Sequence, residues 1–130
     1  MNHPIVQSSE GVTFVGGGPV SGVLTREALA RAPRLVAADG GADRALRLGH
    51  LPEAVIGDMD SISAAARARL AGRVFPLPEQ ATTDFDKVLR SVDAPFYLAL
   101  GFAGARIDHG LAVFNALVRH ADRRCIVIGP

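Results

Sequence analysis

Two aspartates, Asp58 and Asp60, stand one residue apart in the segment VIGDMDS, directly after an apolar run and a glycine. An extended chain rises about 3.3 Å per residue and alternates faces, so both side chains would point the same way, roughly 6–7 Å apart. At an effective dielectric constant of about 20, two like charges at that distance repel each other by roughly 3 kcal/mol. Because Mg²⁺ takes oxygen ligands and is usually held by one or two carboxylates, the pair predicts a metal site. The alternative is an acidic turn before a helix, with Ser61 or Ser63 as the N-cap.

Two glycine-rich segments favour an anionic ligand. The glycines at 16–18 and in DGGAD (39–43) would let backbone N–H groups approach a phosphate closely. The first run does not match the dinucleotide fingerprint G-x-G-x-x-G, and the sequence has no G-x-x-x-x-G-K-[ST] phosphate loop, since its only lysine, Lys87, falls in a predicted helix. Tight turns also use glycine, so this signal is weak by itself.

The segment TTDFDK and the segment GARIDH have both structural and chemical interpretations. Thr83 and Asp86 fit the capping box of a helix, which leaves Asp84 unexplained, although the helix dipole would favour a carboxylate at that position anyway. Arg106 could contact a phosphate and Asp108 could join the metal cluster, although Asp108 could equally be an N-cap. No second histidine lies at ligand spacing from His109, which favours a structural role for it.

Short apolar runs alternate with amphipathic segments along the whole chain. The apolar runs predict strands at 12–15, 34–38, 53–57, 73–77, 95–100 and 125–129. Helices are predicted at 25–32, 41–49, 63–72, 83–92 and about 109–121, the last with Leu111, Phe114, Leu117, Val118 and Ala121 at helical spacing. This alternation predicts an α/β fold: a three-layer sandwich with a mostly parallel six-stranded sheet and helices on both faces. The polar clusters then fall at the carboxyl ends of strands, where open α/β sheets bind ligands.

Composition narrows the classes of partner. The 130 residues suffice for one domain, 1–130, and 48% of them are hydrophobic. With 14 basic and 13 acidic residues, the formal net charge is +1, so nucleic acid and membrane surfaces are not expected as partners. The single cysteine, Cys125, sits in an apolar run and is expected to be a buried structural thiol. The N-terminus lacks the pattern of a signal peptide, and a cytoplasmic location is expected.

Five segments, taken in order, resemble the catalytic, ATP-binding domain of the thiamine pyrophosphokinase family. They are GGG (16–18), ADGGADR (38–44), IGDMDS (56–61), TDFDKVL (83–89) and GARIDH (104–109). The resemblance implies transfer of a pyrophosphoryl group from ATP to thiamine, giving thiamine diphosphate and AMP, in a homodimer that uses Mg²⁺. It also implies that a smaller β-rich domain, which contributes to the thiamine site, is missing from this chain, so we expect a truncated protein with little or no turnover.

The same resemblance assigns roles to residues. It implies Asp58, Asp60 and Asp84 as catalytic and magnesium-binding carboxylates. It implies that the nucleotide is bound by Gly17, Gly18, Asp39, Gly40, Gly41, Thr83, Arg106, Asp108 and His109. Two positions depart from the family pattern: Asp43 stands where asparagine is usual, and Ala81 stands where another aspartate is usual. The first adds negative charge, and the second removes a carboxylate from the predicted metal site.

Two alternatives stay open. The segment DMDSI also resembles the D-x-D motif of haloacid-dehalogenase-like phosphatases, in which the first aspartate is a nucleophile. In those enzymes the motif follows the first strand, whereas here it follows the third predicted strand. The other alternative is a non-catalytic nucleotide-binding or dimerisation module, which Ala81 and the missing domain favour.

Overall fold

The computed structural model describes residues 3–103 and 107–129. Its main sheet consists of β2 (Val12–Val15), β3 (Arg34–Ala38), β4 (Ala54–Gly57), β5 (Val74–Pro76), β7 (Tyr97–Leu100) and β8 (Cys125–Ile128). These strands are ordered β5-β4-β3-β2-β7-β8, and every neighbouring pair is parallel. A parallel sheet brings the carboxyl ends of all six strands to one edge, which confirms the predicted arrangement of the polar clusters.

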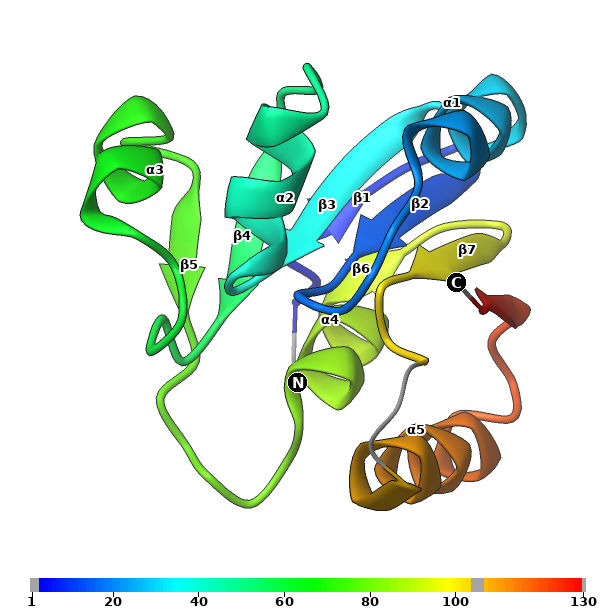
Figure 1. The fold of residues 1–130 in the computed structure, drawn as a ribbon. Coiled ribbons are helices and arrows are strands. Elements are labelled where there is room, and N and C mark those ends of the chain that lie inside the picture. The colour runs from blue at the N-terminus through cyan, green and yellow to red at the C-terminus, as the bar shows by residue number, and fades with distance from the viewer. Residues whose placement is uncertain (1–2, 104–106, 130) are drawn as a thin grey trace.

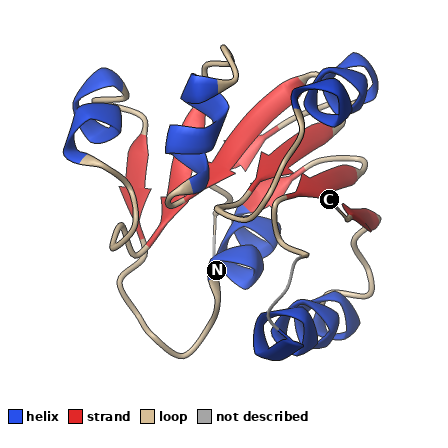
Figure 2. Ribbon diagram, in the orientation of Figure 1, coloured by secondary structure: helices blue, strands red, loops and turns tan. Residues whose placement is uncertain are grey.

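The described residues form five helices. They cover this sheet on two faces, as the sequence predicted (Figures 1 and 2). They are α1 (Gly22–Arg31), α2 (Gly41–Arg47), α3 (Ala64–Arg69), α4 (Asp84–Ser91) and α5 (Ile107–Arg119). The first three lie on one face, and α4 and α5 lie on the other. No helix in the described ranges is both long and apolar enough to span a membrane.

Alternation along the strands builds the two cores that these helices cover. Phe14, Val36 and Ile56 belong to the largest cluster, which α4 and α5 cover, whereas Val15 and Ala37 face the other side. Successive strand residues point to opposite faces, so strands buried on both sides must be apolar throughout. This requirement explains why the apolar runs located the central strands β2, β3, β4 and β7, whereas the edge strands β5 and β8 are apolar although they are partly exposed.

The sequence did not predict a second, small sheet. The strands β1 (Val6–Gln7) and β6 (Val92–Asp93) pair in parallel, with Val6 opposite Val92. Each strand has two residues, which is too short for an alternating pattern to be recognised. The pairing ties the N-terminal segment to the end of α4.

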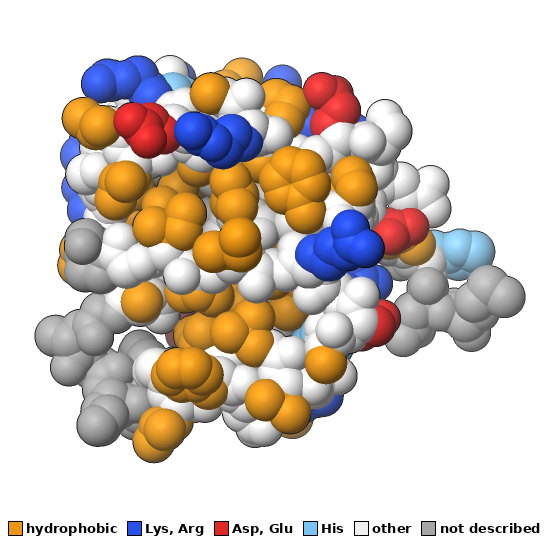
Figure 3. All heavy atoms as spheres, turned by 90° about the vertical axis from the view of Figure 1, so that its right-hand side faces the viewer, with side chains coloured by type: hydrophobic (Ala, Val, Ile, Leu, Met, Phe, Trp, Pro, Cys, Tyr) orange, Lys and Arg blue, Asp and Glu red, His pale blue; other side chains and the backbone are white. Residues whose placement is uncertain are grey.

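Helix α5 packs only in part through the residues whose helical spacing marked it: Leu117 packs against the main core. Leu111, Phe114 and Val118 are 64%, 69% and 75% exposed, whereas Val113 and Ala116 enter the main core. The helix is apolar on more than one side, so periodicity could not tell which stripe meets the sheet. Figure 3 shows apolar side chains gathered on the side of the molecule that α5 and β8 form.

The single cysteine lies where the sequence predicted a structural thiol. Cys125 begins β8, is partly buried and packs against the main core. Burial raises the pKa of its thiol to about 12. Since the thiolate is the reactive species, this thiol is inert at neutral pH.

Close packing of α2 against the end of β2 gives a stability prediction. A Cβ atom added at Gly41 would lie 2.0 Å from the carbonyl oxygen of Val15, which is backbone and cannot move aside. We expect Gly41→Ala to lower the free energy of unfolding by about 1–3 kcal/mol, as measured by urea denaturation. A Cβ at Gly17 meets nothing within 4 Å, so the control Gly17→Ala is expected to change the free energy of unfolding by less than ~0.5 kcal/mol. Equal stabilities of the two variants would contradict this packing.

Candidate functional site

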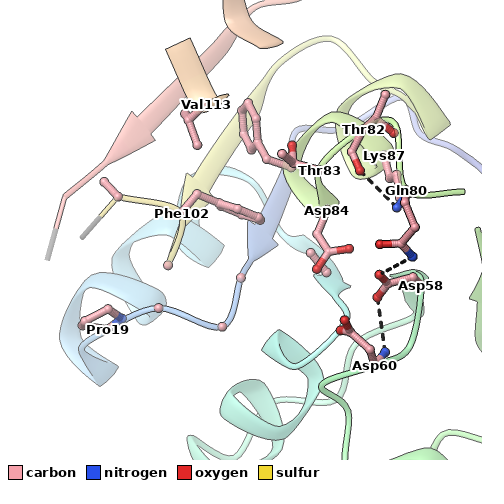
Figure 4. Close-up of a pocket in the computed structure, with 17 residues that line it drawn as sticks. Pro19, Asp58, Asp60, Gln80, Thr82, Thr83, Asp84, Lys87, Phe102 and Val113 are labelled. Atoms are coloured by element: carbon pink, nitrogen blue, oxygen red, sulfur yellow. Dashed lines mark hydrogen bonds between the residues drawn. The ribbon is translucent and has the colours of Figure 1, made fainter. Parts of the chain in front are cut away.

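A cavity of about 640 Å³ opens at the carboxyl ends of the strands (Figure 4). Loops after β2, β4 and β7 and the start of α4 form most of its wall. The lining residues are Gly16, Gly17, Gly18, Pro19, Ala38, Asp58, Asp60, Gln80, Thr82, Thr83, Asp84, Phe85, Lys87, Gly101, Phe102, Ala103 and Val113. The volume lies within the range of small-molecule sites, and one wall is acidic while the other is glycine-rich and apolar.

The glycine wall follows from the close approach of two backbones. The N–H of Gly16 donates to the carbonyl oxygen of Leu100 at 2.7 Å, and the N–H of Gly18 donates to that of Gly101 at 2.9 Å. A Cβ at Gly16 or Gly18 would lie 2.7 Å from the Gly101 oxygen. Gly101 itself has a φ of +82°, a conformation that favours glycine. Packing therefore requires glycine at positions 16 and 18, while the exposed Gly17 is free of this constraint.

Asp39 anchors the loop that carries the two aspartates of GDMDS. Its side chain follows β3, is 1% exposed, and accepts hydrogen bonds from the backbone N–H groups of Asp60 (3.1 Å), Ser61 (3.1 Å) and Ile62 (2.8 Å). Asp39 and Met59 have positive φ values of 45° and 65°. The segment 58–60 is thus a tight turn and not the extended chain that the sequence interpretation assumed.

The turn nevertheless brings the aspartates together. Asp39, Asp58 and Asp60 each offer a carboxylate oxygen, and these atoms lie within 4.8 Å of one another. Asp58 accepts hydrogen bonds from the Asp60 N–H (3.2 Å) and from the Gln80 side-chain amide (3.2 Å). Asp84 points towards Asp58 and Asp60 from the start of α4 (Figure 4). All these candidate metal ligands are hard carboxylate oxygens, so the chemistry of the site fits Mg²⁺.

Crowding of these carboxyl groups separates their pKa values. Burial, with hydrogen bonds to the carboxyls of Asp60 and Asp58, raises the pKa of Asp39 to about 7. Burial acts upward on Asp58 as well, but hydrogen bonds from Asp39, the Asp60 N–H and Gln80 outweigh it and lower its pKa to about 2. Burial and then the charge of Asp58 raise the pKa of Asp84. Neighbouring carboxylates resist simultaneous ionisation, so the cluster retains a proton unless a cation replaces it.

Lys87 is a cavity residue that the sequence interpretation set aside. Its side chain lines the cavity, is 1% exposed, and donates from Nζ to the carbonyl oxygen of Thr82 at 3.2 Å. Residues three apart share a face of a helix, so Lys87 follows Asp84 on the side of α4 that meets the cavity. That spacing was the available signal for Lys87. Gln80 and Phe102 lie in loops, where no periodic pattern marks a site.

The predicted site residues fall into three groups. Gly17, Gly18, Asp58, Asp60, Thr83 and Asp84 line the cavity, and Thr83 is also the N-cap of α4, accepting from the Asp86 N–H at 3.2 Å. Asp39 anchors the aspartate loop, and Gly40 and Gly41 pack beside Ser61 and Val15, outside the cavity wall. Arg106 and the side chains of Asp108 and His109 lie outside the described residues.

Asp43, which departs from the pattern that the resemblance implies, does not line the cavity. Its carboxylate accepts a hydrogen bond from the Ser63 N–H at 2.9 Å and another from the Ser63 hydroxyl. Ser63 is in turn the N-cap of α3, because its hydroxyl accepts from the Ala66 N–H. The extra charge thus supports the start of a helix.

Comparisons with known proteins agree on one family. The family model "Thiamin pyrophosphokinase, catalytic domain" matches residues 25–128. The fold is similar to that of the solved thiamin pyrophosphokinase from Geobacillus thermodenitrificans, with a TM-score of 0.69 and 25% identity over 91% of this chain and 59% of that chain. It is also similar to that of the thiamin pyrophosphokinase from Candida albicans, with a TM-score of 0.71 and 16% identity over 95% of this chain and 60% of that chain. A third similar structure is the thiamine pyrophosphokinase from Bacillus subtilis, with a TM-score of 0.70 and 23% identity over 92% of this chain and 60% of that chain. The chain therefore spans about three fifths of the length of these structures. No curated protein matches the sequence.

The raised pKa of Asp39 predicts that Mg²⁺ binding depends on pH. Because a cation must displace the proton held in the cluster, we expect affinity for Mg²⁺ to rise by up to about tenfold per pH unit below pH 7 and to level off above it. Calorimetric titration with Mg²⁺ in buffers of different ionisation enthalpy measures both the affinity and the proton released. Asp39→Asn removes the titrating group and is expected to flatten this dependence, and also to weaken binding at every pH, because an amide cannot accept all the hydrogen bonds that hold the loop. An affinity that is constant from pH 6 to pH 8 in the unchanged protein would contradict the prediction.

Proposed function

Because the chain belongs to the thiamin pyrophosphokinase catalytic-domain family, we propose that it forms the Mg-ATP site of an enzyme that makes thiamine diphosphate and AMP from thiamine and ATP. The observation that carries this proposal is the convergence of a glycine loop, a carboxylate cluster and a buried lysine on one cavity. Transfer of phosphoryl groups depends on positioning and charge neutralisation more than on covalent chemistry, and these three features supply both.

Each feature has a role towards the triphosphate. Asp58 and Asp60, with Asp84 beside them, would hold Mg²⁺, which when bound neutralises the phosphate oxygens. Lys87 places the positive charge of its ammonium group at the cavity wall, where it would attract the anionic chain of the nucleotide. Within the glycine loop at 16–18, Gly17 leaves room for phosphate oxygens close to the backbone, because a Cβ there would meet nothing within 4 Å, whereas the N–H groups of Gly16 and Gly18 are already bonded to backbone carbonyls.

We assign the proton acceptor to Asp84. In the reaction, the hydroxyethyl oxygen of thiamine forms a bond to the β-phosphorus of ATP, the bond from that phosphorus to the α–β bridging oxygen breaks, and AMP leaves. The hydroxyl proton must go to a base within reach. Asp84 lines the cavity, and burial raises its pKa, which makes it a stronger acceptor than an ordinary carboxylate.

Three implications of the family resemblance stay predictions. They are a homodimer, a β-rich domain that completes the thiamine site, and a cytoplasmic location. The acidic cavity gives no reason to revise the expectation that nucleic acid is not a partner.

AMP formation from ATP, measured with and without thiamine and Mg²⁺, tests the proposed function. We expect thiamine-dependent AMP formation, or at least Mg²⁺-dependent ATP binding, and a loss of either by about 100-fold or more in Asp58→Asn, since this carboxylate is a proposed metal ligand. The control Asp122→Asn changes an exposed carboxylate on the turn after α5 and is expected to behave like the unchanged protein.

Other outcomes separate the alternatives. ATP binding without AMP that neither requires Mg²⁺ nor changes in Asp58→Asn would indicate a nucleotide-binding module. A phosphoenzyme analogue trapped on Asp58 by beryllium fluoride would indicate a phosphatase. An Asp58→Asn variant with full activity would contradict the proposed metal site.

A further inference from the structure

One wall of the cavity is a loop with no regular structure of its own. Residues 77–83 connect β5 to α4, and Gln80, Thr82 and Thr83 from this loop line the cavity. Gln80 and Thr83 are nevertheless exposed. Exposed loops adopt several conformations unless side-chain contacts hold them, so a defined cavity wall requires such contacts here.

The first contact lies within the loop. The carboxylate of Glu79 accepts hydrogen bonds from the backbone N–H of Thr82 at 3.0 Å and from its hydroxyl. These bonds close a turn over residues 79–82. Glu79 does not line the cavity, so its carboxylate holds the loop without forming part of the cavity wall.

The second contact joins this turn to helix α4. Arg90, in the last turn of α4, donates to Glu79 at 2.7 Å and to the Thr82 hydroxyl at 2.8 Å. The same guanidinium lies 3.4 Å from a carboxylate oxygen of Asp86. Asp86 is 2% exposed and also bonds Arg119 and His120 from the end of α5. A buried carboxylate with fixed partners therefore orients Arg90.

The clamped turn carries two interactions that face the cavity. Gln80 donates from its side chain to Asp58 and to the Pro78 carbonyl, at 3.2 and 3.1 Å. The Thr82 carbonyl accepts from Lys87. Displacement of the turn would thus move partners of both a proposed metal ligand and the buried ammonium.

We propose that Arg90 and Glu79 form a clamp that positions residues 79–83, and through them Asp58 and Lys87, for a magnesium nucleoside triphosphate. The inference rests on the proposed function in its choice of ligand. Neither Arg90 nor Glu79 lines the cavity, so both are positioning residues and not ligand contacts. Displacement of binding groups by about 1 Å is enough to weaken function strongly.

A similar ion pair elsewhere in the protein makes it possible to separate an effect on ligand binding from an effect on stability. The Arg90 and Glu79 side chains are 34% and 41% exposed, and exposed ion pairs contribute little to folding. The buried Asp86 keeps Arg119 and His120 as partners when Arg90 is removed. Arg34 and Glu53 form a similar pair at 2.8 Å, with 33% and 35% exposure, and neither lines the cavity. Arg34→Ala therefore controls for the loss of an ion pair of this kind.

The experiment measures Mg-ATP affinity by calorimetry, melting temperature, and hydrogen exchange of a peptide covering residues 78–83. We expect Arg90→Ala to bind Mg-ATP about tenfold more weakly than Arg34→Ala at a similar melting temperature, with faster exchange in this peptide. Arg90→Lys should lie between, because an ammonium group cannot reproduce the fork that reaches Glu79 and Thr82. Glu79→Gln should weaken binding too, and the double variant should add little, since both side chains act through one contact.

The other possible results would overturn either the clamp or the proposed function. Equal affinities of Arg90→Ala and Arg34→Ala would overturn the clamp while leaving the proposed function intact. Loss of affinity in Arg90→Ala but not in Glu79→Gln would overturn it too, because Arg90 would then act on the nucleotide directly. If the unchanged protein binds no Mg-ATP, the proposed function fails. The exchange rates then decide on the clamp: faster exchange in Arg90→Ala supports it, and equal exchange overturns it.

Discussion

The carboxylate of Asp39 accepts hydrogen bonds from successive backbone N–H groups at residues 60–62, and the geometry of the acidic site depends on this contact. It joins the end of β3 to the loop after β4, two neighbouring strands of a parallel sheet. The sheet places the two loops side by side, and the Asp39 contact, supported by the bonds from the Asp60 N–H to Asp58 and from the Ser63 N–H to Asp43, fixes the direction in which the second one turns. Asp58 and Asp60 face a common space as a consequence. A fold-level constraint and one buried side chain together produce the site.

This arrangement stores unfavourable free energy at the site. Asp39 and Met59 adopt left-handed backbone conformations, each of which costs about 1–3 kcal/mol for a residue other than glycine. The carboxyl groups of Asp39 and Asp58 share an environment that cannot hold two charges, so the pKa of one rises and that of the other falls. Sites that bind a divalent cation gain from both features, because the strained loop is already shaped for the ion and the repulsion is relieved when it binds.

The sequence predicted the parts of the structure that depend on local patterns. In the part of the chain that the structure describes, all six strands of the main sheet and all five helices were located, because central strands buried on both faces, short apolar edge strands and amphipathic helices leave clear signals. The site was predicted less completely. The sequence predicted that Asp58 and Asp60 lie close together, but it derived this from the alternation of side chains along a strand. In the structure, a turn at Met59 brings them together, and a hydrogen bond from the Asp60 N–H to Asp39, 21 residues earlier, holds that turn. Lys87 was set aside because it lies outside a phosphate-loop motif. Contacts between distant segments leave no local pattern, so these features required the fold.

Helix α4 explains how the remaining wall of the cavity is held. Its cavity side carries Asp84 and Lys87, one helical turn apart, while the buried Asp86 between them turns away to bond Arg119 and His120. A buried carboxylate is costly unless it is paired, and two guanidinium groups and an imidazole compensate Asp86. The helix therefore cannot rotate or slide without exposing an unpaired charge. Asp39 fixes one side of the cavity and Asp86 the other, so the relative position of the ligand-facing groups is set by two buried carboxylates that do not line the cavity themselves.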